Sequence, residues 1–206
     1  MSFVNIPNFL TLLRVALIPF FTVFYLNRAY DMAFACFLVA GLTDFLDGLI
    51  ARGFNRKTAV GAFLDPAADK LLMNTCFVIF YLMGAVPFWL AALVFGRDLL
   101  IVSGLGYLKV RGVALTFSPT RLSKINTLLQ LVVLFLIFLA AAMISPEGWL
   151  HFPAGGAWLD RHFPWLFMAT GLMTFLTGIQ YTVIGLGLLR SRNGAVSAKK
   201  TQTGGQ

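Results

Sequence analysis

Long apolar runs separated by short polar breaks make up most of this chain of 206 residues. A helix needs about 20 mostly apolar residues to cross the hydrocarbon core of a bilayer. Six runs approach that length, and we expect each to form a transmembrane helix with boundaries loose by several residues. The six predicted spans are residues 9–27, 32–52, 60–82, 86–109, 121–144 and 164–189.

The composition agrees with this pattern, because 59% of the residues are hydrophobic and only 12% are charged. Soluble domains are about 45–50% apolar and about 25% charged. We therefore expect an all-α integral membrane protein with one domain over residues 1–190 and an interfacial lead-in at residues 1–8. The Ser-, Gly- and Lys-rich residues 191–206 are predicted to be a disordered tail.

Positive charges indicate the orientation of the spans. Clusters of Lys and Arg lie at residues 52–57, 109–124 and 190–200, whereas the opposite connections hold only Arg28 and Arg161. The positive-inside rule then predicts that both termini and the connection between the second and third spans, with its flanking aspartates, lie on the cytoplasmic side. The net charge of +8 is explained by this topology, and no basic run with interleaved aromatic residues predicts nucleic-acid binding.

The start of the chain is unlike a targeting segment. It carries no positive charge before Arg14. Signal peptides begin with a charged segment and transit peptides are rich in Arg. We therefore expect a bacterial plasma membrane as the location.

Four of the eight acidic residues lie in two pairs around the second connection. Asp44 and Asp47 are three residues apart, and Asp65 and Asp69 are four apart, so each pair shares a helix face. Counted from Arg56 in the connection, Asp47 and Asp65 are both nine residues away, and Asp44 and Asp69 are twelve and thirteen away. In a helical hairpin the four carboxylates would meet at one level, roughly 10–15 Å from its cytoplasmic end at ~1.5 Å per residue.

Four carboxylates in a membrane protein need counter-charge. Oxygen ligands of this kind suit Mg²⁺ or Mn²⁺, so we expect two divalent ions at this level. His151 and His162, the only histidines, fall in the predicted outward loop, too far along the chain to be ligands. Cys36 and Cys76 lie in apolar runs, where cysteine is usually a small buried hydrophobe.

Small residues follow the first aspartate pair and precede the second. Gly48, Ala51 and Gly61 would leave space for a flat ligand or for a close helix, and helix packing is a common role of small residues in membranes. Arg52, taken alone, would serve equally well as a positive-inside anchor. From the residues alone these alternatives stay open.

The joint spacing of these residues resembles the signature of the CDP-alcohol phosphatidyltransferases. The family pattern is D-x-x-D-G-x-x-A-R, eight residues, and then G-x-x-x-D-x-x-x-D. The chain fits it without departure at Asp44, Asp47, Gly48, Ala51, Arg52, Gly61, Asp65 and Asp69. The segment from Ile6 to Arg14 also looks like the beginning of family members, and the resemblance reaches the fifth span through residues 118–127.

The resemblance implies roles for the matching residues. Asp44, Asp47 and Asp65 would be ligands to two metal ions, and Asp69 would be both a ligand and the general base. The cytidine diphosphate of the donor, CDP-diacylglycerol, would be bordered by Asp44 and the four positions Gly48, Ala51, Arg52 and Gly61. The implied fold is a six-helix membrane domain with a polar cavity open to the cytoplasm, usually as a homodimer.

The chemistry that fits is direct transfer of a phosphatidyl group to a hydroxyl acceptor with release of CMP. Two metals can bridge a diphosphate, and a carboxylate near like charges can act as a base. The sequence has no Ser-His or Cys-His arrangement that suggests a covalent nucleophile. A site at interfacial depth would leave the acyl chains of the donor among the membrane lipids.

Residues outside the aspartate signature bear on the identity of the acceptor. Residues 123–127 read S-K-I-N-T, whereas relatives that use glycerol 3-phosphate typically have G-K-x-K-T there. This form, with Arg97-Asp98 in the fourth span, looks more like cardiolipin synthases of the eukaryotic type, whose acceptor is phosphatidylglycerol. Both acceptors are anions, and we expect Arg97, Arg121 and Lys124 to bind the acceptor. The alternatives are interfacial snorkelling for the last two and an ion pair of Arg97 in the membrane.

Adjacent residues point in different directions on a helix, so Arg97 and Asp98 are expected to have separate partners. Lys70 is expected to be interfacial or paired structurally.

Phosphatidylglycerophosphate synthesis from glycerol 3-phosphate is the alternative function. A divalent-cation transporter would explain the carboxylates but not Ala51 and Arg52 at their spacing. A non-catalytic lipid-binding scaffold would not need an intact signature.

Overall fold

Six helices account for nearly all of the structure. The computed structural model describes the backbone of residues 6–54, 59–112, 120–146 and 148–203, and the side chains of residues 12–43, 69–112, 120–146 and 148–190. The helices are α1 (Ile6–Leu26), α2 (Tyr30–Phe54), α3 (Ala59–Leu82), α4 (Phe88–Val110), α5 (Arg121–Ile144) and α6 (Pro153–Thr203). The first five coincide with the predicted spans to within three residues at each end.

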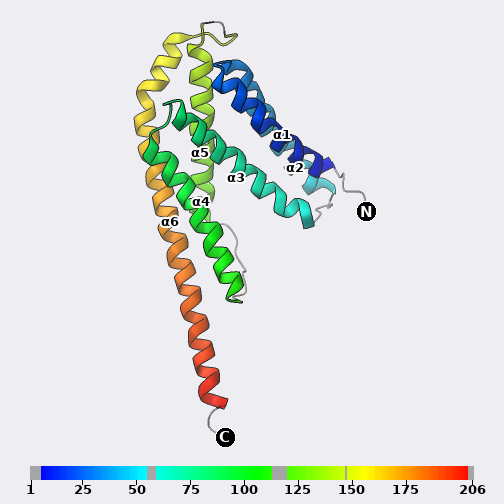
Figure 1. Cartoon of the computed structure of the whole chain (residues 1–206), viewed down its shortest axis with the longest axis vertical. Helices are drawn as coiled ribbons and strands as arrows, with labels where there is room; N and C mark the ends of the chain where they lie inside the picture. The colour runs from blue at the N-terminus through cyan, green and yellow to red at the C-terminus, as the bar shows by residue number, and fades with distance from the viewer. Residues whose placement is uncertain (1–5, 55–58, 113–119, 147, 204–206) are drawn as a thin grey trace.

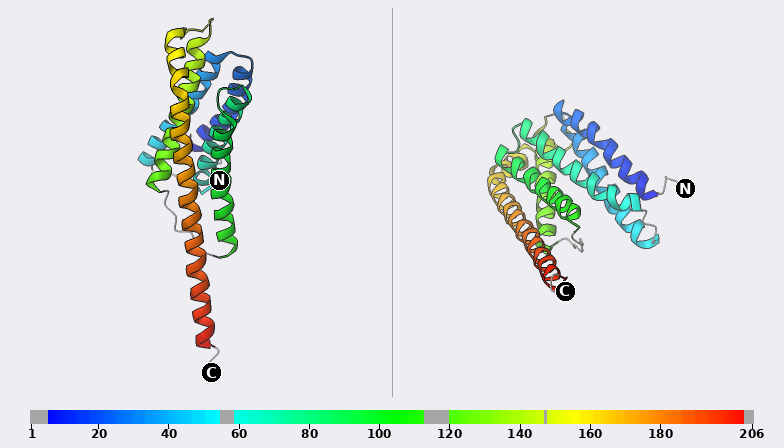
Figure 2. Two further views of the ribbon diagram at one scale, coloured as in Figure 1. Left: turned by 90° about the vertical axis from the view of Figure 1, so that its left-hand side faces the viewer. Right: turned by 60° about the horizontal axis from the view of Figure 1, so that its bottom comes forward.

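The helices form two groups, α1 to α3 and α4 to α6. α1 packs on α2 and α3, whereas α6 packs on α5 and α4 (Figure 1). The groups are joined by contacts of α2 and α3 with α5 and of α3 with α4. α6 is the longest helix and extends past the end of α4 in both side views (Figures 1 and 2). All described secondary structure is helical, so the all-α prediction holds for this part of the chain.

α6 differs from its prediction at both ends. It begins at Pro153 instead of near residue 164, so His162 lies within a helix and not in a loop. Proline is accommodated in the first turn of a helix, where its missing N–H has no helical partner in any case. α6 also continues to Thr203, through the tail that we expected to be disordered, because extending an existing helix requires no new nucleation.

Three helices in the described part of the chain are long and apolar enough to cross a membrane: Phe88–Val110, Arg121–Ile144 and Pro153–Arg190. Shorter apolar stretches lie at Leu12–Leu26 and Tyr30–Thr43. The helices therefore support a membrane protein, while six complete crossings and the cytoplasmic cavity remain predictions.

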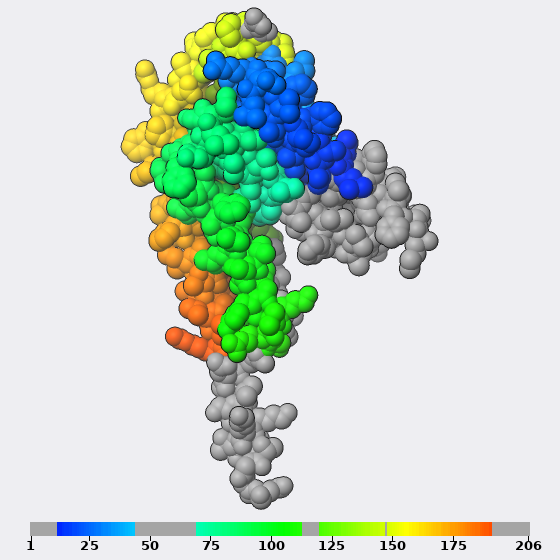
Figure 3. Space-filling view, in the orientation of Figure 1, coloured from blue at the N-terminus to red at the C-terminus, as the bar shows by residue number. Residues whose placement is uncertain are grey.

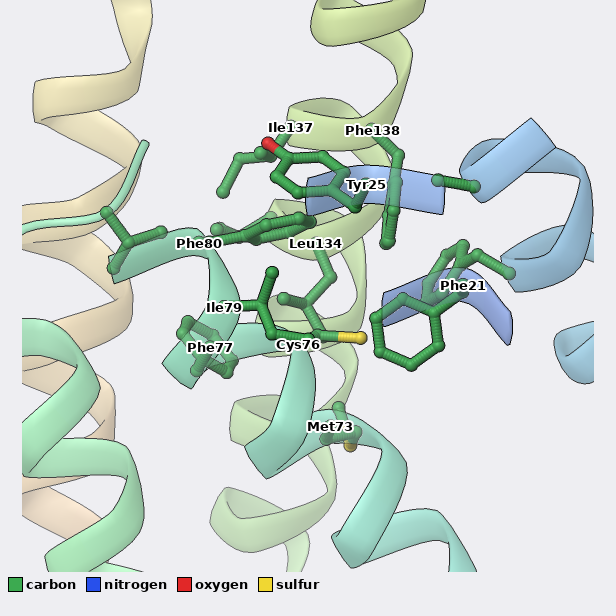
Figure 4. Packing of buried hydrophobic residues seen from close by; sticks show 14 of the residues in the cluster. Phe21, Tyr25, Met73, Cys76, Phe77, Ile79, Phe80, Leu134, Ile137 and Phe138 are labelled. Carbon is green, nitrogen blue, oxygen red and sulfur yellow. The ribbon is translucent and has the colours of Figure 1, made fainter. Parts of the chain in front are cut away.

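Phe138 of α5 is the centre of the apolar core. Its buried ring lies 4.7 Å, centroid to centroid, from both Phe37 of α2 and Phe80 of α3. Phe21 and Tyr25 of α1 contact the same ring at 6.1 and 5.6 Å (Figure 4). Each aromatic pair contributes about 0.5–1.5 kcal/mol beyond its buried area. This cluster fixes α1, α2 and α3 against α5, and thereby the helices that carry the aspartate signature.

Candidate active site

Asp69 is the one aspartate of the signature whose side chain the structure describes. It lies on α3, and its side chain is 42% exposed. Arg14 of α1, only 1% exposed, donates from Nη1 to Oδ1 of Asp69. Figure 3 shows α1, in blue, beside the described part of α3, in teal. Arg14 thus holds Oδ1 of Asp69, and part of the Asp69 side chain lies at the surface.

Arg14 was missed as a site residue by the sequence analysis. A signal was present, because a charged residue inside an apolar membrane helix is expensive and points to a function or to a partner. Arg14 is the only charged residue within α1. We noted it only as part of a motif, and its position eight residues after the start of α1 gave no indication of which acidic residue it would meet.

The other residues of the signature lie outside the described side chains. Their backbone is helical: Asp44, Asp47, Gly48, Ala51 and Arg52 belong to α2, and Gly61 and Asp65 belong to α3. Each aspartate pair therefore lies on a helix at the spacing that gives a shared face. The described residues contain no cluster of three or more metal-binding side chains, but three of the four predicted ligands are not among them. The metal site remains a prediction.

Asp98 of α4 is the centre of a buried polar network. Its Oδ1 accepts from Arg97 Nη1 at 2.7 Å and from Lys70 Nζ at 3.0 Å. Its Oδ2 accepts from Asn74 Nδ2 at 3.4 Å. Since Lys70 and Asn74 belong to α3, the network joins α3 to α4 immediately beside Asp69. The structural pairing expected for Lys70 is confirmed.

Arg97 is 5% exposed and extends the network to α5 and α6. Its Nη2 donates to Ser123 Oγ at 2.5 Å, and its Cζ lies 5.6 Å from the centre of the Tyr181 ring. The expectation that Arg97 and Asp98 have separate partners was wrong in part, because the two residues also pair with each other. Their Cβ atoms diverge, but the long arginine side chain bends back to reach its neighbour.

The start of α5 presents two faces. Arg121 and Lys124 are exposed, whereas Ser123 is buried. Thr120 caps the helix, since its Oγ1 accepts from Ser123 N at 3.2 Å, and it also donates to Gln180 Oε1 of α6 at 3.0 Å. Among the described contacts, Arg97 meets Ser123 but neither Arg121 nor Lys124. The three predicted acceptor-binding residues are therefore not brought together by direct contact.

A polar ladder also joins α5 to α6. Thr174 donates to Asn126 Oδ1 at 2.9 Å, and Gln130 Nε2 donates to Thr174 Oγ1 at 3.3 Å. All three side chains are fully buried. Polar side chains that bond across helices stabilise helix contacts in membranes, where few other polar partners exist. Asn126, which we interpreted as part of an acceptor motif, has a packing role in the structure.

Comparison with known proteins identifies the family. The family model for CDP-alcohol phosphatidyltransferase matches residues 4–174, which include Arg14, the aspartate signature, Arg97 and the start of α5. The chain belongs to the CDP-alcohol phosphatidyltransferase family. The resemblance found in the hairpin is thereby confirmed over most of the chain.

Curated members of the family carry two kinds of name. The chain is 35% identical over 195 residues to a cardiolipin synthase (CMP-forming)/mitochondrial hydrolase fusion protein of Schizosaccharomyces pombe, covering 87% of this chain and 31% of that protein. It is 32% identical over 158 residues to the cardiolipin synthase (CMP-forming) of Rattus norvegicus, covering 69% of this chain and 51% of that protein. The chain thus spans about a third and about half of the length of these two relatives.

A third relative matches over nearly its whole length. The CDP-diacylglycerol–glycerol-3-phosphate 3-phosphatidyltransferase of Salmonella typhimurium is 33% identical over 183 residues, covering 86% of this chain and 92% of that protein. Both acceptor classes considered from the sequence are therefore represented among the phosphatidyltransferases that resemble this chain.

Proposed function

We propose that this protein is a membrane enzyme that transfers the phosphatidyl group of CDP-diacylglycerol to phosphatidylglycerol, forming cardiolipin and releasing CMP. The observation that carries the proposal is the complete aspartate signature on two successive helices, ending in a partly exposed Asp69 that the buried Arg14 holds. Family membership and relatives named cardiolipin synthase support it.

The proposed reaction is a direct displacement. The acceptor hydroxyl oxygen attacks the phosphorus of the phosphatidyl group, the bond from that phosphorus to the CMP oxygen breaks, and CMP leaves. Asp69 takes the hydroxyl proton as general base. Arg14 holds one carboxylate oxygen from α1, and the partly exposed Asp69 side chain is proposed to face the acceptor hydroxyl.

The residues present fit a pair of divalent ions. The donor set of Asp44, Asp47, Asp65 and Asp69 consists only of carboxylate oxygens, which suits Mg²⁺ or Mn²⁺. The bound ions would supply positive charge at the diphosphate of the donor. Gly48, Ala51, Arg52 and Gly61 are proposed to border the cytidine diphosphate.

The identity of the acceptor is inferred from the residues at the start of α5. Ser123 and Asn126 depart from the G-K-x-K-T form, and this favours phosphatidylglycerol. Arg97, Arg121 and Lys124 are proposed to bind the acceptor phosphate. Glycerol 3-phosphate is the second candidate, because the Salmonella phosphatidyltransferase aligns with 86% of this chain and over 92% of its own length.

From the positive-inside pattern of the sequence, we propose that the site and both termini lie on the cytoplasmic side of the membrane. A bacterial plasma membrane is the proposed location. The functional form is proposed to be a homodimer.

In the decisive experiment, the purified protein is incubated with labelled CDP-diacylglycerol, with Mg²⁺ or Mn²⁺, and with one acceptor at a time. CMP release with phosphatidylglycerol, together with cardiolipin as the lipid product, is the expected result. Ready formation of phosphatidylglycerophosphate without cardiolipin would establish the second candidate instead. No CMP release with any hydroxyl acceptor would refute the phosphatidyltransferase proposal altogether.

A further inference from the structure

Two adjoining cavities lie between α4 and α6. Their volumes are about 380 and about 540 Å³, and Leu100 and Thr182 contribute to the walls of both. Along α4 they extend from Leu93 to Leu108, a rise of about 22 Å at ~1.5 Å per residue. Figures 1 and 2 show α4 and α6 running side by side in the same direction. We call the two cavities together the α4–α6 groove.

The free space beside three glycines at seven-residue intervals on α6 shows that the groove becomes wider along the helix. A Cβ built on Gly171 would lie 2.4 Å from Cζ3 of Trp89, and one on Gly178 would lie 4.0 Å from Cγ of Arg97. A Cβ on Gly185 would meet nothing within 4 Å. Residues seven apart lie on nearly the same helix face. The open space beside α6 therefore grows toward the C-terminal ends of the two helices.

The wide end of the groove has an apolar lining within two helices that qualify as membrane spans. Its walls include Leu105 and Leu108 of α4 and Leu186 and Leu189 of α6. The groove is longer than the ~15 Å that one leaflet contributes to a hydrocarbon core of ~30 Å, so an acyl chain from the nearer leaflet fits within it. The apolar lining also suits an acyl chain.

The mouth of the groove is cationic. Lys109 and Arg190 directly follow the lining residues Leu108 and Leu189, and both are exposed. Arg111 is also exposed; its Nη2 donates to the hydroxyl of Tyr107, a lining residue, at 2.8 Å. The sequence has no acidic residue between Asp98 and Glu147 or after Asp160. The charge at this end therefore complements an anion at the membrane surface.

We propose that the α4–α6 groove binds one anionic phospholipid, with an acyl chain between the two helices and the phosphate at Arg111 and Arg190. No aspartate whose side chain the structure describes lines the groove, but Arg97, which we propose to bind the acceptor, lines its narrow end. Occupation of the wide end needs neither CDP-diacylglycerol nor a metal ion, so the proposal is tested there without the transferase reaction.

Glycine pairs on both walls provide matched variants. Gly104 and Gly185 line the groove, whereas Gly106 and Gly187, two residues further along the same helices, do not. A Cβ on any of these four glycines would meet nothing within 4 Å, so all four positions have the same open space at the backbone. Gly104→Leu and Gly185→Leu fill the groove, and Gly106→Leu and Gly187→Leu are the controls with the same gain in helix propensity.

The test measures lipid adducts of the full chain by native mass spectrometry, titrating dioleoyl phosphatidylglycerol or dioleoyl phosphatidylcholine into detergent without donor or metal. We expect one saturable phosphatidylglycerol adduct, weakened at least about ten-fold by either groove variant, as for a blocked apolar pocket. The two controls should bind like the wild type. Arg111→Gln should reduce the preference for phosphatidylglycerol over phosphatidylcholine about five-fold.

Three results would overturn the proposal. Equal binding of both lipids by the wild type would mean ordinary annular lipid. Equal loss of the adduct in groove and control variants would mean that the binding is not in the groove. A change in the fraction of dimer caused by the groove variants, with lipid adducts unchanged, would mean that a second copy of the chain covers this face.

Discussion

Replacing Asp98 by asparagine should destabilise the protein more than any other single change in the polar network of α3 and α4. The substitution keeps the shape of the side chain but removes the negative charge that faces Arg97. Arg97 is 5% exposed, and its remaining described polar contacts are the Ser123 hydroxyl and the face of the Tyr181 ring. Among the side chains that the structure describes, the buried guanidinium would thus be left without a counter-ion.

Removing one partner of a buried ion pair costs about 3–5 kcal/mol. We expect about 3 kcal/mol for Asp98→Asn, the lower end of that range, because the amide oxygen can still accept a hydrogen bond. Arg97→Met should cost less, since Asp98 keeps Lys70 and Asn74 as donors. Lys70→Met should cost about 0–1 kcal/mol, because the Lys70 side chain is 36% exposed and water can replace it.

The assay is equilibrium unfolding in mixed detergent micelles, followed by the fluorescence of the native tryptophans. The double variant Arg97→Met/Asp98→Asn should recover roughly 2 kcal/mol relative to the sum of the single variants, because it contains no orphaned charge. The reasoning is refuted if Lys70→Met is as damaging as Asp98→Asn, or if the two single effects simply add. Transferase activity should not return in the double variant if Arg97 binds the acceptor.

Four further outcomes follow from the proposed site. Excess chelator, or Asp47→Asn, should abolish CMP release while the helical content is unchanged, as measured by circular dichroism. Asp69→Asn should bind CDP-diacylglycerol but retain less than roughly a tenth of the wild-type kcat, since general-base catalysis contributes ~10²–10⁴. Arg121→Ala and Lys124→Ala should each raise the KM for the acceptor by roughly 10- to 150-fold and leave the KM for the donor nearly unchanged. Ser123→Gly removes the hydroxyl that accepts from Nη2 of Arg97. The ratio of turnover with glycerol 3-phosphate to turnover with phosphatidylglycerol should then rise roughly ten-fold, which corresponds to the free energy of one charge-assisted hydrogen bond.

Each of these expectations has a contrary result. Full activity in excess chelator would refute the two-metal hypothesis. An Asp69→Asn variant with a kcat near that of the wild type would show that another group is the general base. Loss of donor binding in the Arg121 or Lys124 variants would place these residues at the nucleotide. An unchanged acceptor ratio in Ser123→Gly would mean that the contact with Arg97 is only structural.

The positions of the helices could be predicted because apolar runs and polar breaks alternate clearly along the chain. The misjudged end of α6 shows the limit of that signal. Asp160, Arg161 and His162 resemble a loop by polarity, yet they lie within the first turns of a helix that begins at Pro153. Polarity reports where a helix can leave the membrane, and it does not report where the helix begins.

The partners of charged residues were harder to predict than the residues themselves. Arg14 and Asp69 are 55 positions apart, and only the packing of α1 on α3 brings them together. Arg97 and Asp98 were judged from the directions of their Cβ atoms, although a long flexible side chain is not limited to that direction. In contrast, the signature on α2 and α3 could be recognised because all its spacings lie within one short stretch of the sequence, residues 44–69.

The start of α5 connects acceptor choice to packing. The two positions at which the chain departs from the G-K-x-K-T form, Ser123 and Asn126, are both buried. Ser123 accepts a hydrogen bond from Arg97 of α4, and Asn126 accepts one from Thr174 of α6. The exposed Arg121 and Lys124 occur on another face of the same turns.

A change between the two acceptor classes would therefore have to alter the contacts among α4, α5 and α6 as well as the charges that meet the phosphate. This coupling explains why exchanging a surface lysine alone is a weak test of specificity, whereas Ser123, which contacts Arg97 directly, is a strong one.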